Sequence, residues 1–391
     1  MATYRTAIIA CGMIARVHAR GWLGVEGQPT TIGALADTNP DARSEFGDFF
    51  HVPEPQRYAD YREMLDAERP DFVDICSWHQ HHAEMVIAAA ARRPKAILCQ
   101  KPMATSMKEA GEMMMACDRN GVKLIIAYQR PHHATWLKAR ELIRDGAVGD
   151  VRQVEIYCGG NMLNTNSHNI RLGLFLMDEP KVNWIIGAVE RTCDLQERGL
   201  PAEEASLGLA GCGNGANLVI AGNLIPGMDQ GCRVVGTDGL MELGTTRHPD
   251  SVIPSDEPMY SPEGPTARYN FEIGTARYFN SSTAGWVEVE AAWHDPWAHQ
   301  CRNTLDWVES KVEEAISSGQ RGLAVQEVMM GLYESARKRQ RIYMPLKTMV
   351  NPLQLMIDAG DLPVEWPGVS EVRSRIVRGE AMSWHDEAAA E

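Results

Sequence analysis

The stretch Thr6-Ala-Ile-Ile-Ala10-Cys11-Gly12-Met13-Ile14-Ala15 decides how the first part of this sequence folds. Its first five residues are mostly apolar and include two isoleucines, which is typical of a buried strand. The glycine predicts a turn, and a helical pattern follows from Ile14 to Trp22. A strand, a Gly-containing turn and a helix in this order are the context that a dinucleotide-binding unit requires.

The turn reads Ala10-x-Gly12-x-x-Ala15, so alanine stands where the tight-turn glycine is usual. We expect the pyrophosphate of a dinucleotide to approach Gly12 and the first amides of the helix. Asp37 ends the second strand and is placed to accept hydrogen bonds from the adenosine ribose, which favours NAD over NADP because Thr38 and Asn39 supply no arginine. The alternative is an ordinary strand-to-helix turn with a helix-capping aspartate. The expected cofactor contacts in this unit are Ala10, Gly12, Met13, Ile14 and Asp37.

From Arg5 to about Tyr128, short apolar runs alternate with helical patterns, which predicts a parallel sheet with crossover helices. The expected strands are Thr6–Ala10, Thr31–Ala36, Phe72–Cys76, Ala96–Cys99 and Lys123–Ala127. The expected helices are Ile14–Trp22, Tyr61–Ala67, His82–Ala91, Ser106–Asn120 and Thr135–Asp145.

After Asp150 the pattern changes to alternating strands separated by Gly, Pro and Asn clusters, which is typical of an antiparallel sheet. The expected strands include Val151–Tyr157, Ala216–Ala221 and Trp286–Ala292, and two helices are expected at Asn303–Ser317 and Ala324–Arg339. We therefore predict an α/β protein with a Rossmann domain at residues 1–130 and an α+β domain at residues 131–391.

The composition is that of an ordinary folded protein, with 391 residues, 44% hydrophobic and 23% charged. A formal charge of -14 argues against a nucleic-acid partner. No apolar run has the ~20 residues that cross a bilayer. Nine scattered cysteines without a Cys-x-x-Cys pair, and an N-terminus unlike a signal peptide, lead us to expect a cytoplasmic protein.

Polar residues gather after two of the expected parallel strands. One strand runs into Ser77-Trp-His79-Gln-His81-His82, and the next ends in Gln100-Lys101-Pro102. Open α/β sheets bind ligands at the carboxyl ends of their strands, so we expect further cofactor contacts there. The three histidines are closely spaced but lack an identifiable fourth ligand, and we expect no metal. The additional cofactor contacts are Ser77, His79, His82, Gln100 and Lys101.

Taken together, the degenerate turn, Asp37, His82-Ala-Glu84 and Gln100-Lys101-Pro102 resemble the Gfo/Idh/MocA family of oxidoreductases. The resemblance extends to Tyr128-Gln-Arg130, Gly149-Asp-Val-Arg152 and several segments of the last hundred residues. It implies a Rossmann domain followed by a large, mostly antiparallel open sheet that is often used for oligomer contacts. A homo-oligomer, dimer or tetramer, is therefore expected.

The family carries an Asp four residues before a His on one helix, and Asn164-Thr-Asn-Ser-His168 resembles that segment. By resemblance, Lys101 holds the reacting hydroxyl and His168 takes its proton, a role that suits histidine near neutral pH. Asn164 departs from the pattern, because an amide orients a substrate but takes no proton. Arg130, His299 and Asn303 are further expected substrate contacts, although a salt bridge or domain packing is the ordinary alternative for such residues.

The resemblance implies an NAD-dependent dehydrogenase that acts on a secondary hydroxyl of a sugar, inositol or sugar derivative. Two alternatives stay open. One is a redox-assisted glycosidase or lyase that recycles NAD within each turnover. The other is a non-catalytic cofactor-binding partner or regulator, which the substitution at Asn164 keeps in view.

Overall fold

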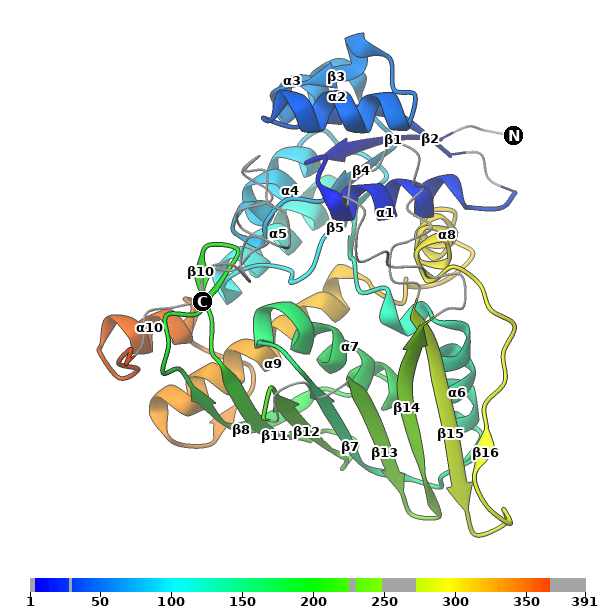
Figure 1. Ribbon diagram of the computed structural model, residues 1–391, viewed down its shortest axis with the longest axis vertical. Coiled ribbons are helices and arrows are strands. Elements are labelled where there is room, and N and C mark those ends of the chain that lie inside the picture. Colours follow the sequence, from blue (N-terminus) through cyan, green and yellow to red (C-terminus); the bar gives the residue numbers. More distant parts are fainter. Residues whose placement is uncertain (1–3, 28–29, 225–229, 248–271, 366–391) are drawn as a thin grey trace, which may run out of the picture.

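The computed structural model describes residues 4–27, 30–224, 230–247 and 272–365, and these form two large sheets and a two-stranded hairpin, with helices between and around the large sheets (Figure 1). The first is a six-stranded parallel sheet in the order β3-β2-β1-β4-β5-β6, which is the strand order of a Rossmann domain. Its strands are β1 (Tyr4–Ile9), β2 (Thr30–Ala36), β3 (Arg57–Tyr58), β4 (Phe72–Ile75), β5 (Ala96–Cys99) and β6 (Lys123–Ile126).

The helices of this first domain follow its strands as the sequence pattern predicts. They are α1 (Met13–Leu23), α2 (Pro40–Phe49), α3 (Tyr61–Glu68), α4 (His82–Ala90) and α5 (Met107–Asn120), with short turns η1 (Glu54–Gln56) and η2 (His79–His81). The turn η3 (Arg130–His132) and α6 (Ala134–Arg144) come next, and α6 packs on the second sheet. Only α2 and the two-residue β3 were missed. Phe46 and Gly47 are the buried residues of α2, so its sequence carries almost no apolar period.

The second sheet has nine strands in the order β16-β15-β14-β13-β7-β12-β11-β8-β17, and all neighbours except β7 and β12 run antiparallel. Its strands are β7 (Val151–Cys158), β8 (Val182–Glu190), β11 (Ala205–Cys212), β12 (Asn217–Gly222), β13 (Gly231–Gly236), β14 (Gly239–Arg247), β15 (Glu272–Asn280), β16 (Val287–Glu288) and β17 (Ile342–Tyr343). The expected mostly antiparallel sheet is confirmed.

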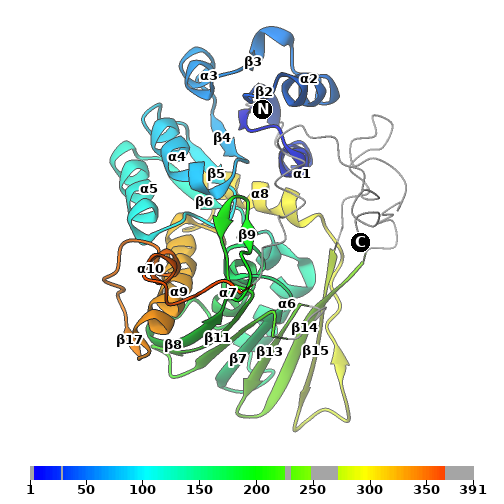
Figure 2. The same ribbon diagram turned by 60° about the vertical axis from the view of Figure 1, so that its left-hand side comes forward.

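Helices cover the face of the large sheet that is turned toward the Rossmann domain (Figure 2). The π-helical turn η4 (Met162–Asn166) leads into α7 (Ser167–Leu176), and α9 (Gly319–Lys338) lies over β8 and β11. Gly187 and Gly208 permit the close approach of α9, since a Cβ at either would stand 2.5–2.6 Å from the side chain of Leu332. The last described helix is α10 (Pro352–Asp358).

Two predictions for the segment before α9 are wrong. The strand expected at Trp286–Ala292 is reduced to the exposed pair Val287–Glu288. The helix expected at Asn303–Ser317 is α8, which spans Pro296–Val308. Asp295 caps α8 by accepting from the Trp297 amide at 2.8 Å, and Pro296 suits the first helical position, so these two residues set its start.

Although α8 follows the large sheet in sequence, it packs on the Rossmann domain. Gly21 of α1 lies against Trp297, whose backbone carbon would be 3.1 Å from a Cβ at that glycine. Cys301 and Leu305 join the same apolar cluster as Trp22 and Phe72. The domain division at residue 130 stays a prediction, and the chain after it contributes a helix to the first domain's core.

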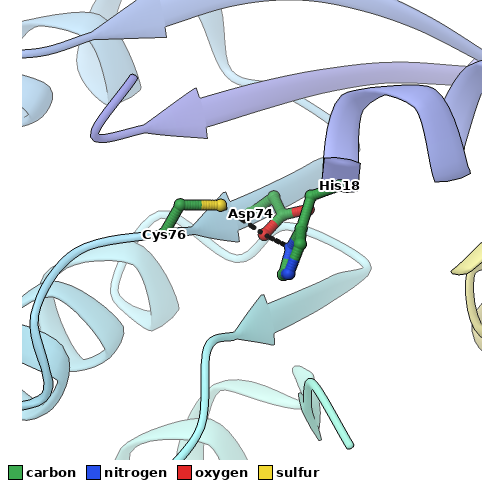
Figure 3. Close-up of side chains that lie close together, drawn as sticks. All are labelled: His18, Asp74 and Cys76. Carbon is green, nitrogen blue, oxygen red and sulfur yellow. Dashed lines mark hydrogen bonds and ion pairs between the residues drawn. The ribbon is translucent and has the colours of Figure 1, made fainter. Parts of the chain in front are cut away.

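A buried polar cluster ties α1 to the sheet (Figure 3). The carboxylate of Asp74 on β4 faces the His18 ring at 2.8 Å and accepts from Trp22 Nε1 at 2.8 Å. The Cys76 thiol lies 3.4 Å from the same carboxylate. His18, Asp74 and Cys76 have metal-ligating atoms close together, but the hydrogen bonds of Asp74 to two side chains on α1 account for the arrangement.

We expect Asp74→Ala to destabilise the protein by about 3–5 kcal/mol, because it leaves the buried His18 and Trp22 nitrogens without their partner. The measurement is the midpoint of denaturant unfolding. Asp66→Ala is the matched control, because Asp66 pairs with Arg92 at the surface. Equal midpoints for the two variants would contradict the role given to Asp74.

Histidines of η3 and α8 form a second buried group at the domain junction. The Nδ1 atoms of His132 and His299 are 3.0 Å apart, and His299 stacks on His294 with ring centroids at 4.6 Å. The His133 ring receives the Gly274 amide at 3.3 Å. Burial lowers the pKa of His133 to about 3 and that of His299 to about 4, so both rings are neutral at pH 7.

This burial predicts a loss of stability in mild acid. In the unfolded chain these rings take up a proton near pH 6.5, whereas the folded protein resists protonation until about pH 4. The unfolded state therefore binds more protons between these values, and stability falls as the pH falls through this window. As the pH is lowered, the thermal midpoint of unfolding should fall less steeply in His299→Gln than in the unaltered protein. In His51→Gln, at an exposed position, the midpoint should fall as steeply as in the unaltered protein. Identical slopes in all three would refute the assignment.

Candidate active site

The nucleotide turn has the backbone shape of a phosphate-binding loop despite its alanine. Ala10 adopts φ 68°, the left-handed region that a glycine enters without strain, and its amide donates to Ala36 O at 2.8 Å. Alanine is thus forced into the conformation that the motif requires of its first glycine. Such strain in a non-glycine residue costs on the order of 1 kcal/mol and is typical of functional sites.

The nucleotide turn is open at Gly12. A Cβ built on Gly12 would meet no atom within 4 Å, so the turn is open on the side where the α1 amides begin. No side chain caps α1, and its first turn carries no acidic residue. The amides of Met13 and Ile14 therefore begin a helix whose positive end is available to an anion, as the pyrophosphate of NAD requires.

Asp37 is oriented by backbone amides. Its Oδ2 accepts from Cys11 at 2.7 Å and its Oδ1 from Asn39 at 2.8 Å. Arg43 was missed in the sequence, because α2 was not predicted. Its guanidinium donates to the Asp37 carbonyl oxygen at 2.6 Å, so an arginine does lie next to the residue expected to bind the ribose.

The residues after β4 lie at the carboxyl edge of the sheet, as expected. His82 Nδ1 is 3.0 Å from Pro102 O and its Nε2 is 3.0 Å from Ser77 O, so this ring joins the ends of β4 and β5. Burial lowers its pKa to about 4. Gln100 Oε1 accepts from the Lys101 amide at 2.5 Å. His79 is 2% exposed and its Nε2 has no hydrogen-bond partner among the described residues.

Lys101 connects the two domains. Its Nζ donates to Asn164 Oδ1 at 2.8 Å and to the Asn164 carbonyl oxygen at 3.0 Å. Lys101 follows β5 of the Rossmann sheet, whereas Asn164 belongs to η4 beside the large sheet. The structure therefore brings together two residues that are 63 positions apart.

The expectation that Asn164 and His168 share one regular α-helix is wrong. Asn164 lies in the π-turn η4, and α7 begins only at Ser167. The Asn161 side chain caps the turn by accepting from the Asn164 amide at 2.9 Å. Glu203, fully buried, accepts from the Met162 amide and from the Tyr333 hydroxyl at 2.6 Å. A π-turn widens the helix by one residue and is frequent at functional sites.

His168 is buried beside Lys101. Its ring meets that of Tyr128 edge-on with centroids 5.8 Å apart, and its Nδ1 has no hydrogen-bond partner among the described residues. Burial, reinforced by the positive charges of Lys101, Arg130 and Arg198, holds the pKa of His168 well below its usual value. The ring is thus neutral at pH 7 and has a nitrogen able to accept a proton from a ligand.

The other three expected substrate contacts hydrogen-bond to residues other than Lys101 and Asn164, although the charge of Arg130 acts on His168. Arg130 is 6% exposed and donates to Asn169 Oδ1 and Gln230 Oε1. Asn303 accepts from the Ile316 amide at 2.7 Å, and His299 belongs to the histidine group of η3 and α8. Among the described residues, neither His299 nor Asn303 hydrogen-bonds to Lys101, and their roles stay predictions.

Several residues of the site carried no sequence signal. Asn161, Glu203 and Arg198 belong to no motif that spacing identifies, and Glu203 is 41 residues from Met162, whose amide donates to it.

The described helices include none with the length and apolar character needed to cross a bilayer.

Part of the chain is similar in sequence to known oxidoreductases. Residues 4–128 match the model of an oxidoreductase family with an NAD-binding Rossmann fold. D-apiose dehydrogenase of Paraburkholderia graminis is 33% identical over 146 residues, which cover 37% of this chain and 38% of that protein. Myo-inositol 2-dehydrogenase of Thermotoga maritima is 23% identical over 189 residues, 45% of this chain and 55% of that protein.

The likeness in fold extends further than the likeness in sequence. An aldose-aldose oxidoreductase from Caulobacter crescentus, solved with glycerol, superposes with a TM-score of 0.71 at 20% identity and covers 88% of this chain and 100% of its own. The chain spans about two fifths to just over half of the length of the two dehydrogenases above. Residues 4–128 are thus similar to the NAD-binding Rossmann domain of the Gfo/Idh/MocA family of oxidoreductases.

Proposed function

We propose that this protein is an NAD-dependent dehydrogenase that oxidises a secondary hydroxyl of a sugar, an inositol or a related polyol. The observation that carries the proposal is the contact of Lys101 Nζ with Asn164 beside the neutral ring of His168. This group stands at the carboxyl edge of a sheet whose first turn is open at Gly12. Such an edge is where Rossmann folds bind cofactor and substrate.

Lys101 and His168 divide the work on the hydroxyl. The ammonium of Lys101 donates a hydrogen bond to the substrate oxygen and orients it, and its positive charge favours loss of the hydroxyl proton. A ring nitrogen of His168 accepts that proton, which requires a neutral imidazole such as burial provides. When bound, NAD supplies the acceptor for the hydride that leaves the carbon.

Asn164 keeps the geometry but not the charge of the family's aspartate. Its amide oxygen fixes the Lys101 ammonium at 2.8 Å, as a carboxylate oxygen would. Because the amide neither takes nor gives a proton in this pH range, the acid-base role falls to His168 alone. The substitution is therefore compatible with catalysis, and no described contact favours the redox-assisted or the non-catalytic alternative.

The substrate class rests on the relatives. The matched proteins are named as dehydrogenases of D-apiose and of myo-inositol, which are polyhydroxy compounds. We extend that class to this protein as a proposal, because the chain covers only part of those enzymes' length.

A homo-oligomer is proposed on the outer face of the large sheet. Ile186 on β8 pairs in register with Leu209 on β11, and both are exposed, by 42% and 37%. Leu207, two residues along β11, is 48% exposed on the same face. An apolar row on a sheet face that no helix covers is typical of a subunit contact. A cytoplasmic location stays a prediction.

The first prediction for this function concerns the cofactor. Gly12→Ala should weaken NAD binding at least about tenfold, since the added methyl fills the open space for the pyrophosphate. Folding should be unchanged, because Gly12 has φ -71°, which alanine adopts readily, and its new Cβ meets no atom. Gly111→Ala, which also adds a Cβ into open space but on α5, is the control. Titration calorimetry with NAD and NADP measures both; equal NAD affinity in the two variants would contradict the site.

The second prediction concerns the chemistry. With NAD and a panel of sugars, inositols and polyols, the protein should form NADH, and Lys101→Ala should lower kcat/KM at least about a hundredfold. Lys108→Ala, an exposed lysine on α5, should leave the rate unchanged. Full activity of Lys101→Ala would overturn the assignment, and release of aglycone from a glycoside without net NADH would favour the redox-assisted alternative.

A further inference from the structure

A hairpin between two neighbouring strands of the large sheet extends toward the Rossmann domain. β8 ends at Glu190 and β11 begins at Ala205, and these two residues are partners in register. The intervening residues 191–204 leave the sheet and form the hairpin of β9 (Gln196–Glu197) and β10 (Leu200–Pro201). Both views show this hairpin rising from the sheet toward α4 and α5 (Figures 1 and 2).

The base of the hairpin is fixed by one carboxylate. Glu204 Oε2 accepts from the Cys193 amide at 2.7 Å and from the Thr192 hydroxyl at 2.9 Å, as well as from the Thr192 amide. Glu203 beside it is fully buried against Met162 and Tyr333. The hairpin is therefore anchored to the same π-turn that carries Asn164.

The tip presents an arginine in a constrained conformation. Arg198 and Gly199 form the two-residue loop, and both have positive φ, 50° and 80°, as a type I′ turn requires. Glycine, asparagine and aspartate are the usual residues at such positions, so arginine is held there against its backbone preference. Its guanidinium pairs with Glu197 at 2.9 Å, and Glu197, 4% exposed, accepts from Asn161 Nδ2 at 3.1 Å.

A chain of contacts connects the guanidinium to Lys101: Arg198 pairs with Glu197, Glu197 accepts from Asn161 Nδ2, and Asn161 Oδ1 accepts from the amide of Asn164, whose side chain holds Lys101. The charge of Arg198 acts on the rings of His79 and His82, from the Rossmann edge, and of His168, from the large-sheet side. Arg198 thus adds a permanent positive charge to the space where Lys101 and His168 meet the substrate.

The same space contains buried atoms that no described residue satisfies. His79 Nε2 and His168 Nδ1 have no hydrogen-bond partner, and their side chains are 2% and 7% exposed. Buried polar atoms are normally paired, so each of these two atoms is available to hydrogen-bond a polar ligand. A neutral polyol satisfies such atoms but gives nothing to a guanidinium that is already costly to desolvate.

We propose that the substrate carries an anionic group, a carboxylate or a phosphate, that Arg198 binds at the tip of the hairpin while Lys101 and His168 act on a hydroxyl of the same molecule. This inference rests on the proposed function and narrows its substrate class to sugar acids or sugar phosphates. The guanidinium presents parallel N–H groups that match both oxyanions, and such contacts are the strongest hydrogen bonds available to a ligand.

The alternative role for Arg198 is structural, in which its pair with Glu197 only locks the hairpin. The two roles predict different effects of Arg198→Gln. If Arg198 only locks the hairpin, Arg198→Gln should lower the thermal midpoint of unfolding and reduce the affinity for all ligands to the same extent. A binding residue would remove the preference for an anionic ligand over its neutral parent and leave NADH affinity as it was.

The test measures binding to the full chain saturated with NADH, so that no turnover occurs. Titration calorimetry compares D-glucose, D-galactose and D-mannose with their uronates and 6-phosphates. At least one anionic member should bind about tenfold or more tighter than its neutral parent. Arg198→Gln should abolish that difference, Arg198→Lys should retain part of it, and Arg339→Gln, also at a left-handed position but at the exposed end of α9, should leave it intact.

The outcomes separate the inference from the proposed function. If a uronate is the ligand that binds most tightly, the site is a carboxylate site. If a sugar phosphate binds most tightly, the site is a phosphate site. If no anionic member binds ahead of its parent, or if the preference persists in Arg198→Gln, the inference is overturned. If NADH forms from neutral polyols alone, the anion-site inference is overturned, but the proposed dehydrogenase activity stands. If the preference for anions depends on Arg198 but no hydride transfer is detected, the anion site is supported and the proposed dehydrogenase activity is contradicted.

Discussion

The hydrogen bonds from Lys101 Nζ to Asn164 hold the candidate active site together, because they join a residue of the Rossmann sheet to one beside the large sheet. Neither domain contains the site alone. Its geometry depends on how firmly each end is fixed. On one side His82 links the ends of β4 and β5, and on the other Asn161 and Glu203 hold the π-turn. The site is thus preorganised by hydrogen bonds to backbone groups rather than by the packing of its own side chains.

Burial determines which protonation states the site uses. The ring of His168 is neutral because it is buried and surrounded by the charges of Lys101, Arg130 and Arg198. A neutral imidazole beside fixed cations is suited to receive a proton and poorly suited to hold it without help from solvent or substrate. An anionic substrate group would offset those cations and raise the basicity of His168 when it binds. Substrate binding and proton acceptance would then be coupled by electrostatics.

The sequence predicted the Rossmann domain closely, because buried strands such as Ala96–Cys99 and helices such as α1 have clear periodicity. It also paired Lys101 with His168, but through the family resemblance rather than through spacing. What it missed depends on contacts between distant residues. The start of α8 is set by Asp295 and Pro296, and the support of the π-turn comes from Glu203, which no local pattern connects to Met162. Arg43 was missed because α2 buries too little apolar surface to be recognised.

The most direct test of the account is a crystal structure of the protein with NAD. We expect the pyrophosphate to lie over Gly12 and the adenosine ribose to face Asp37. The nicotinamide ring should reach the space beside Lys101 and His168. A dinucleotide bound with its nicotinamide turned away from Lys101, or with its pyrophosphate away from the Gly12 turn, would contradict the assignment of this site.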